Sequence, residues 1–443
     1  MSTDTRLRRP ATTPSTSRIV IASLIGTTVE FYDFYIYGTA AALVLGQLFF
    51  PPGAAGAQSL AAFATFGIAF LARPIGSFIF GHFGDRLGRK STLVTSLLLM
   101  GLSTTLIGVL PSYATAGALA PALLCVLRLG QGIGLGGEWG GAALLATENA
   151  PRGRQAWFGM FPQLGPSLGF LMSNGLFLLL FSLLTNDQFA AWGWRIPFLV
   201  SAVLVAVGLY ARRSLTETPA FAALAARGGQ VRVPLGELFR HHGLNLVLGS
   251  LSMVVCYAIF YISTVFALNY GTRINHIPRG TFLGIMCAAI LVMAIVTPIS
   301  ARLSDRFGCR PVLLVGCVIT ALSGFAMSPL LGAGTTDGAL LFLCLELGLM
   351  GLLFAPMGAF LPGLFPAHVR YTGASAAYNL GGILGASLAP YAAQLLLERG
   401  GLPAVGLYIT SAAVLSFLAL LVLRQTPAAA REDVVASYDT TTA

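Results

Sequence analysis

Apolar residues form twelve long runs that alternate with short polar connections. A helix needs about 20 predominantly apolar residues, and as few as about 17, to cross the hydrocarbon core of a bilayer. Each run is long enough for one such helix, so the pattern predicts an all-α membrane protein with twelve transmembrane helices. The runs cover approximately residues 19–50, 58–80, 92–110, 117–147, 155–184, 195–211, 243–270, 281–301, 311–332, 338–363, 372–397 and 403–423.

The longest polar interruption, residues 212–242, divides the runs six and six. The sequence also repeats across this division, because SDRFG at 304–308, after the eighth run, echoes GDRLG at 84–88, after the second. Transporters built from two parallel repeats place the substrate site between their halves. We therefore predict two pseudo-symmetric six-helix bundles. The predicted parts are an N-terminal tail at 1–18, the first bundle at 19–211, a cytoplasmic linker at 212–242, the second bundle at 243–424 and a C-terminal tail at 425–443.

The composition excludes a soluble globular protein. Of the 443 residues, 56% are hydrophobic and 9% are charged, whereas about 25% are charged in a typical soluble domain. The net charge of +10 comes from residues scattered over the connections, so they form no single basic face for nucleic acid. Most of the arginines fall on alternate connections. By the positive-inside rule, this predicts a multi-pass plasma-membrane protein with both termini in the cytoplasm.

Four charged residues interrupt the apolar runs of the first half. Glu30 and Asp33 share a face of the first run, and Arg128 and Glu138 lie roughly 15 Å apart along the fourth. A charge at the centre of a membrane costs at least about 2.5 kcal/mol, so these side chains should face a bundle interior or a water-filled cavity. We predict that they couple transport to protons, with Asp33 as the carrier. The alternative is a permanent structural ion pair.

Residues 81–90, GHFGDRLGRK, resemble the signature G-x-x-x-D-R-x-G-R-K of the major facilitator superfamily. Within that superfamily the chain resembles the metabolite:proton symporters, which include shikimate and α-ketoglutarate permeases. The most specific pieces are EFYDF at 30–34, FLARPIG at 70–76, RLGQG at 128–132 and GGEWGG at 136–141. The resemblance covers nearly all of the chain. It implies the major facilitator fold, transport by alternating access and a place in a bacterial inner membrane.

The same resemblance implies a gate at the cytoplasmic side. Glycines permit a tight reversal of the chain there, and the acid and bases can form an ion network that holds the halves together. Glu148 and Arg152 resemble the acid-then-arginine pattern that pairs with this loop, and the alternative is a surface acid without a partner. The predicted gating residues are Gly81, Asp85, Arg86, Gly88, Arg89, Lys90, Glu148, Arg152, Asp305 and Arg306.

Polar and aromatic residues inside the runs are candidates for contact with the substrate, although each is as well suited to holding helices together. We predict the substrate contacts among Tyr37, Arg128, Gln131, Trp139, Gln163, Asn174, Tyr257, Tyr261, Tyr378 and Asn379.

Arg73 precedes a proline toward the cytoplasmic end of the second run. We expect it to reach the membrane interface in a structural role. Glu346, in the tenth run, is a candidate for proton handling or for orienting the substrate.

The leading interpretation is a secondary transporter that imports a small organic anion with protons. Its partners would be the substrate, protons and the lipid bilayer, with no nucleic acid, cofactor or metal, and it would function as a monomer. A proton-coupled exporter is the alternative, favoured by the piece GPSLG at 165–169, which resembles part of an antiporter motif. A membrane-embedded enzyme is disfavoured because no HExxH motif occurs. A nutrient sensor would usually add a long signalling segment.

Overall fold

The computed structural model describes residues 16–52, 55–87, 89–213, 234–387 and 389–423. In these ranges the chain is helical, with short connections and no strand. The first half contains α1 (Thr16–Ala40), α2 (Gly46–Phe49), α3 (Ala55–Leu87), α4 (Arg89–Val109), α5 (Tyr113–Ala116), α6 (Leu119–Glu148), α7 (Gln155–Leu183), α8 (Asn186–Gln188) and α9 (Arg195–Arg213). The second half contains α11 (Pro234–Tyr261), α12 (Ala267–Arg273), α13 (Arg279–Phe307), α14 (Cys309–Ser323), α15 (Met327–Leu331), α16 (Thr336–Phe360), α17 (Arg370–Gly382) and α18 (Ala389–Val422).

In the described ranges the twelve apolar runs lie mainly on helix, and the all-α fold class is confirmed. Within the described ranges, nine helical stretches are long and apolar enough to cross a membrane on their own. One of them, Arg370–Val422, contains the last two runs, which are separated by a turn at Gly401 with φ 67°. The first two runs lie on α1–α2 and α3, which are not among the nine.

The predicted linker is partly helical. Helix α9 continues to Arg213 and α11 begins at Pro234, eight residues before the predicted end of the linker at 242. Helix α11 bends at His242, where φ is −125° and ψ is 16°. Residues 1–15, 214–233 and 424–443 lie outside the described residues. They include most of the tail predicted at 1–18 and all of the tail predicted at 425–443, so the rest of these boundaries stays a prediction.

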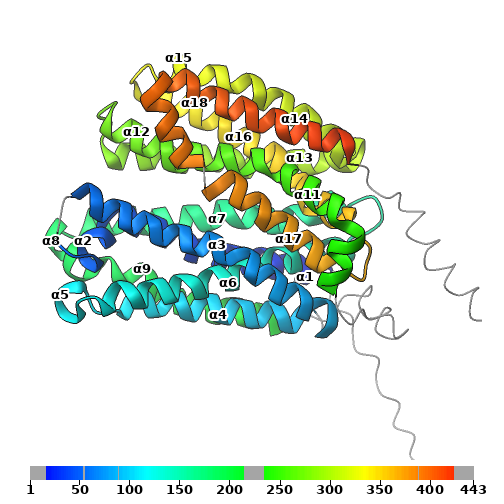
Figure 1. The fold of residues 1–443 in the computed structure, drawn as a ribbon, viewed down its shortest axis with the longest axis horizontal. Helices are drawn as coiled ribbons and strands as arrows, with labels where there is room; N and C mark the ends of the chain where they lie inside the picture. Colours follow the sequence, from blue (N-terminus) through cyan, green and yellow to red (C-terminus); the bar gives the residue numbers. More distant parts are fainter. Residues whose placement is uncertain (1–15, 53–54, 88, 214–233, 388, 424–443) are drawn as a thin grey trace, which may run out of the picture.

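The helices of each half pack side by side, and the two halves stack along one face (Figure 1). Across this face α7 packs against α13 and α16, while α17 packs against α3 and α6. We call the end where α9 stops and α11 starts the linker end, and the opposite end, where α12 is followed by α13, the far end. The start of α1 and the end of α18 both lie at the linker end (Figure 1).

The distribution of side chains is that of a protein surrounded by lipid. Large apolar residues such as Leu71, Val203 and Ile295 are more than 60% exposed. Charged residues in the middle of the helices are instead buried, with Asp33, Arg128 and Glu346 each at 0%. Charges are costly in hydrocarbon, so this arrangement places them where other helices shield them.

Candidate substrate pathway

Polar contacts between the two halves close the linker end. Arg370 Nη1 donates to Glu148 Oε1 at 3.2 Å, and both side chains are largely buried. The carboxylate of Asp305 accepts hydrogen bonds from the backbone N–H groups of Ala156, at 2.9 Å, and Trp157, at 3.1 Å. These N–H groups begin α7, where the helix dipole favours a negative charge. The closure therefore joins α6 to α17 and α7 to α13.

Nearer the middle, α17 makes direct contact with the backbone of α6. Tyr371 Oη donates to the carbonyl oxygen of Gly137 at 2.5 Å, and Asn379 Nδ2 donates to that of Gly136 at 2.9 Å. Residues without side chains let the two helices come this close. The two halves are thus held together over several turns from the linker end inward.

The structure places two of the predicted gating acids, Glu148 and Asp305, in contacts between the halves. Arg152 and Arg306 are exposed at the same end, and Lys90 is partly buried. The side chains of Asp85, Arg86 and Arg89, and all of Gly88, lie outside what the structure describes, so the ion network of that loop stays a prediction. Sequence reasoning did not assign Arg370 to the gate. The available signal was its position after the tenth run, which repeats that of Arg152 after the fourth.

Gly81 has a specific structural role in this closure. A Cβ atom at this position would lie 2.8 Å from Thr372 Cα, a backbone atom of α17 that has no freedom to rotate away. Gly81→Ala should therefore disfavour the closed linker end. Spin labels at Gly153 and Phe307, exposed on opposite halves, should report longer distances in double electron–electron resonance, measured without the native cysteines.

Gly67→Ala is the matched control, because it lies on the same helix and a Cβ there would meet nothing within 4 Å. It should leave the distance distribution of the parent protein unchanged. If Gly81→Ala also leaves it unchanged, the close approach of α3 and α17 does not determine the closure.

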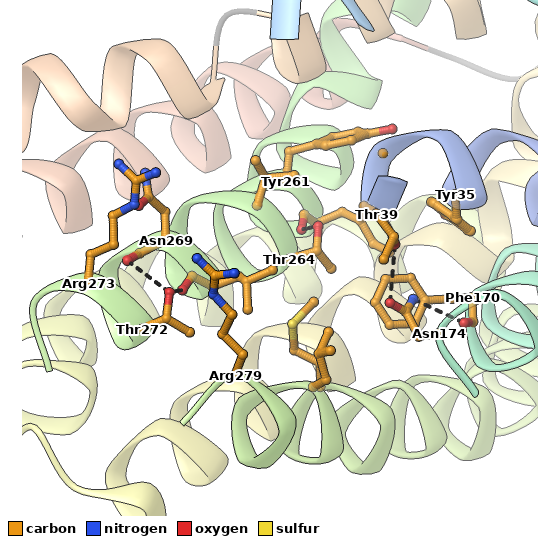
Figure 2. Close-up of a pocket in the computed structure, with 16 residues that line it drawn as sticks. Tyr35, Thr39, Phe170, Asn174, Tyr261, Thr264, Asn269, Thr272, Arg273 and Arg279 are labelled. Carbon is orange, nitrogen blue, oxygen red and sulfur yellow. Dashed lines mark hydrogen bonds between the residues drawn. The ribbon is translucent and has the colours of Figure 1, made fainter. Parts of the chain in front are cut away.

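A cavity of about 170 Å³ lies between the halves on the far side of these contacts. Its walls are α1 and α7 from the first half, and α11, α12 and α13 from the second. Figure 2 shows Arg273 and Arg279 at one end of the cavity and Tyr35, Phe170 and Asn174 at the other. Both arginines are exposed at the far end of the molecule. The cavity therefore extends from the mid-molecule aromatic residues to a positively charged mouth.

Polar groups from both halves line the cavity. Thr39 Oγ1 donates to Asn174 Oδ1 at 3.3 Å, which joins α1 to α7 (Figure 2). On the opposite wall, the helix from α11 to α12 passes through a π-helical segment, Ile262–Phe266, that brings Thr264 into the lining. Single π-helical turns within α-helices are frequent at functional sites.

Aromatic side chains form a floor between the cavity and the closed linker end. The ring of Trp139 stacks on that of Tyr378, with centroids 4.1 Å apart and an angle of 4°. Tyr378 also contacts Tyr257, one helical turn from the cavity-lining Tyr261. Trp139 Nε1 donates to Gln163 Oε1 at 2.7 Å, and Gln163 Nε2 donates to the carbonyl oxygen of Phe354 at 2.7 Å. The floor therefore combines residues of both halves.

Arg73 is buried beside this floor, with 2% exposure. The expectation that it reaches the membrane interface is wrong, because its guanidinium carbon lies 5.0 Å from the ring centroids of both Phe34 and Phe70. Phe70 packs edge-on against Tyr261 of the cavity. Among the described residues, Arg73 Nε and Nη1 have no hydrogen-bond partner. A buried cation with unsatisfied donors is suited to an anionic ligand.

Arg128, in contrast, is held within the first half. Its guanidinium carbon lies 3.7 Å from the ring centroid of Tyr37, and its Nη1 donates to Gln131 Oε1 at 2.6 Å. Gln131 Nε2 donates in turn to Thr104 Oγ1 at 2.7 Å. These polar groups form a chain between α1, α6 and α4.

The predicted proton-coupling carboxylates are also buried in the first half. Asp33 lies beside the hydroxyl groups of Ser201 and Thr104, and neither of its oxygens has a hydrogen-bond partner among the described residues. Asp33 thus faces the interior of the first bundle, not the cavity between the halves. The Thr104 hydroxyl beside it accepts a hydrogen bond from Gln131, which in turn accepts one from Arg128. Glu138 Oε2 accepts a hydrogen bond from Ser96 at 2.7 Å, and Glu30 is 1% exposed.

The ten predicted substrate contacts therefore fall into four places. Asn174 and Tyr261 line the cavity. Trp139, Gln163, Tyr257 and Tyr378 form the floor, Asn379 belongs to the closure, and Tyr37, Arg128 and Gln131 lie inside the first half. Sequence reasoning did not identify Tyr35, Thr39, Phe170, Thr264, Thr272, Arg273 and Arg279 as cavity residues.

Two helical halves, a polar closure at one end and a cavity leading to the other define a multi-pass membrane transporter. The chain belongs to the Major Facilitator Superfamily, whose family model matches residues 23–370 and 280–437. This confirms the resemblance found in the signature at residues 81–90. Its fold and its relatives support a metabolite transporter of the bacterial inner membrane.

Two relatives cover nearly the whole chain. The chain is 52% identical over 417 residues to the inner membrane metabolite transport protein YhjE of Escherichia coli (strain K12). This match covers 93% of the chain and 95% of that protein. It is 38% identical over 413 residues to the shikimate transporter of the same organism, with coverage of 92% and 94%. Among solved structures, the proton:xylose symporter XylE bound to 6-bromo-6-deoxy-D-glucose has a TM-score of 0.75 at 15% identity, and the match covers 92% of this chain and 94% of that one. That likeness concerns the fold.

Proposed function

We propose that the protein imports a small organic anion together with protons, by alternating access, as a monomer. The observation that carries the proposal is Arg73, a buried guanidinium one aromatic layer from the cavity, whose Nε and Nη1 have no hydrogen-bond partner in the part of the chain that the structure describes. Such a group can bind a carboxylate with charge-assisted hydrogen bonds. The relative named as a shikimate transporter supports an anionic substrate, since shikimate carries a carboxylate.

The substrate would enter from the far end and meet the positively charged mouth first. The linker end would face the cytoplasm, in agreement with the arginines on that side and with the positive-inside rule. After the substrate and a proton bind, the closure made by Glu148, Arg370 and Asp305 would open and the cavity would close. Asp33 would carry the proton, because it is a fully buried carboxylate beside Thr104, and hydrogen bonds lead from Thr104 through Gln131 to Arg128 on α6, the helix that contacts α17.

The alternative of proton-driven export was favoured by residues 165–169. In the structure these residues pack α7 against α1, and a Cβ at Gly169 would lie 2.7 Å from the backbone nitrogen of Tyr32. This packing accounts for the glycine without reference to the direction of transport.

Counterflow in proteoliposomes tests the proposal. The panel should contain shikimate, keto acids, dicarboxylates, benzoates and betaines, with a pH-sensitive dye inside the vesicles. We expect uptake of an anionic member with acidification of the lumen. Uptake of betaines alone would contradict the anionic substrate, and anion uptake without acidification would contradict proton symport.

The arginines at the mouth should act on the rate of substrate capture. Arg273→Gln and Arg279→Gln should each raise the KM for an anionic substrate by about 3-fold at low ionic strength, since exposed charges steer ligands over about one Debye length. The maximal rate should stay unchanged. The difference from the parent protein should disappear in about 0.5 M salt, where such interactions are screened.

Arg399→Gln is the matched control, because Arg399 is exposed near the same end but does not line the cavity. An equal effect of this substitution would mean that the overall charge, and not the mouth, attracts the substrate. An effect of Arg273→Gln that persists in high salt would point to direct binding.

A further inference from the structure

Three metal-ligating side chains meet at the linker end of the second half. They are Glu237 in the first turns of α11, His242 at its bend, and His368 in the connection between α16 and α17. One potential ligand atom from each lies within 4.8 Å of the others. Among the described residues, no other group of three or more such side chains meets this criterion.

The bend in α11 explains how the two residues of this helix converge. Residues five apart on a regular helix point about 140° away from each other. The non-helical backbone at His242, with φ −125° and ψ 16°, changes this direction. His241, which lies one regular turn after Glu237, pairs with Glu237 Oε1 at 3.2 Å. His242 instead faces His368, with ring centroids 6.3 Å apart.

We infer that Glu237, His242 and His368 form a binding site for a divalent transition-metal ion such as Zn²⁺. Two imidazoles and a carboxylate are a common ligand set for such ions, and they leave a fourth position for water. Ligand atoms about 2.1 Å from zinc lie roughly 3.4 Å apart in tetrahedral geometry. The three ligand atoms, within 4.8 Å of one another on partly buried side chains, would move closer together on binding the ion.

A bound ion would connect α11 to the segment that leads into the gate. His368 precedes Arg370 by two residues, and Arg370 pairs with Glu148 of the first half. An ion at this site would restrain the connection that positions Arg370, so we expect it to slow the opening of the linker end. The site would then act as an inhibitory regulatory site, separate from the substrate cavity.

Zinc binding to the purified full-length protein tests the inference directly. The protein should carry no histidine tag and be dialysed against a chelator, and Zn²⁺ should then be titrated in competition with a chromophoric chelator. We expect one tight ion per chain, with a Kd on the order of micromolar. Glu237→Gln, His242→Ala and His368→Ala should each weaken binding at least about 10-fold.

His241→Ala is the matched control. It removes a neighbouring imidazole and its pairing with Glu237, but none of the three proposed ligands, so the affinity should be retained or increased. Co²⁺ should give absorption bands of a tetrahedral site in the parent protein and lose them in His368→Ala. Absence of stoichiometric zinc binding, or equal loss in His241→Ala, would overturn the inference. Neither binding measurement depends on substrate identity or on proton coupling.

Discussion

Arg73→Gln should raise the Kd for the transported anion by about 100-fold, since loss of one partner of a buried charge pair typically costs about 2–5 kcal/mol. The free protein holds this guanidinium with two nitrogen atoms that have no hydrogen-bond partner among the described residues. A substrate carboxylate would satisfy them, and the amide of glutamine would not restore the charge. The measurement is equilibrium binding of labelled substrate to purified protein.

The substitution should lower the free energy of unfolding of the free protein by less than it lowers the free energy of substrate binding. Burying the charge of Arg73 is itself costly, and the contacts of its guanidinium with Phe34 and Phe70 contribute only about 0.5–2 kcal/mol. Arg73→Lys should bind with intermediate affinity because it keeps the charge but loses the planar fork. If Arg73→Gln binds substrate like the parent protein, Arg73 has a packing role and the anionic substrate loses its main support.

Asp33→Asn should abolish uphill accumulation while exchange without a gradient remains within a few-fold of the parent protein. Asparagine has almost the same shape but takes up no proton. Asp33 is fully buried with neither oxygen hydrogen-bonded to a described residue, so the change should disturb the packing little. Proteoliposomes with an imposed pH gradient should show an accumulation ratio near one.

Glu346→Gln is the informative comparison, because Glu346 is an equally buried carboxylate in the second half. It should retain uphill accumulation. Loss of accumulation in Glu346→Gln but not in Asp33→Asn would place proton coupling in the other bundle.

Hydropathy predicted the helices well, because lipid requires long apolar segments. Hydropathy failed to predict helix where the residues are polar and the need to match the lipid no longer applies. The first turns of α11, from Pro234, are polar enough to be interpreted as linker, although they form helix at the membrane boundary. The repeated motif pointed to Asp305 as part of the closure, and the resemblance of Glu148 and Arg152 to the acid-then-arginine pattern pointed to Glu148. Their partners, Arg370 and the start of α7, depend on how the halves meet.

Positions within the membrane were harder to predict, because depth along a helix does not determine which neighbour a side chain faces. Arg73 was placed correctly in its helix, but the rotation of α3 turns it toward Phe34 and away from lipid. Asp33 and Tyr35 are two residues apart, yet one lies beside α4 and α9 and the other lines the cavity. Such rotations follow from side-chain packing between helices, which a single sequence does not specify.

The segment Ile262–Phe266 determines which residues of the following helix face the cavity. A π-helical turn accommodates one residue more than an α-helical turn, so every later side chain is offset by about 100°. Deleting one residue there would restore ordinary winding and rotate Asn269, Thr272 and Arg273 away from their present direction. The chemical character of the entrance thus depends on a single inserted residue, and length variation at this point would change selectivity without any substitution in the lining itself.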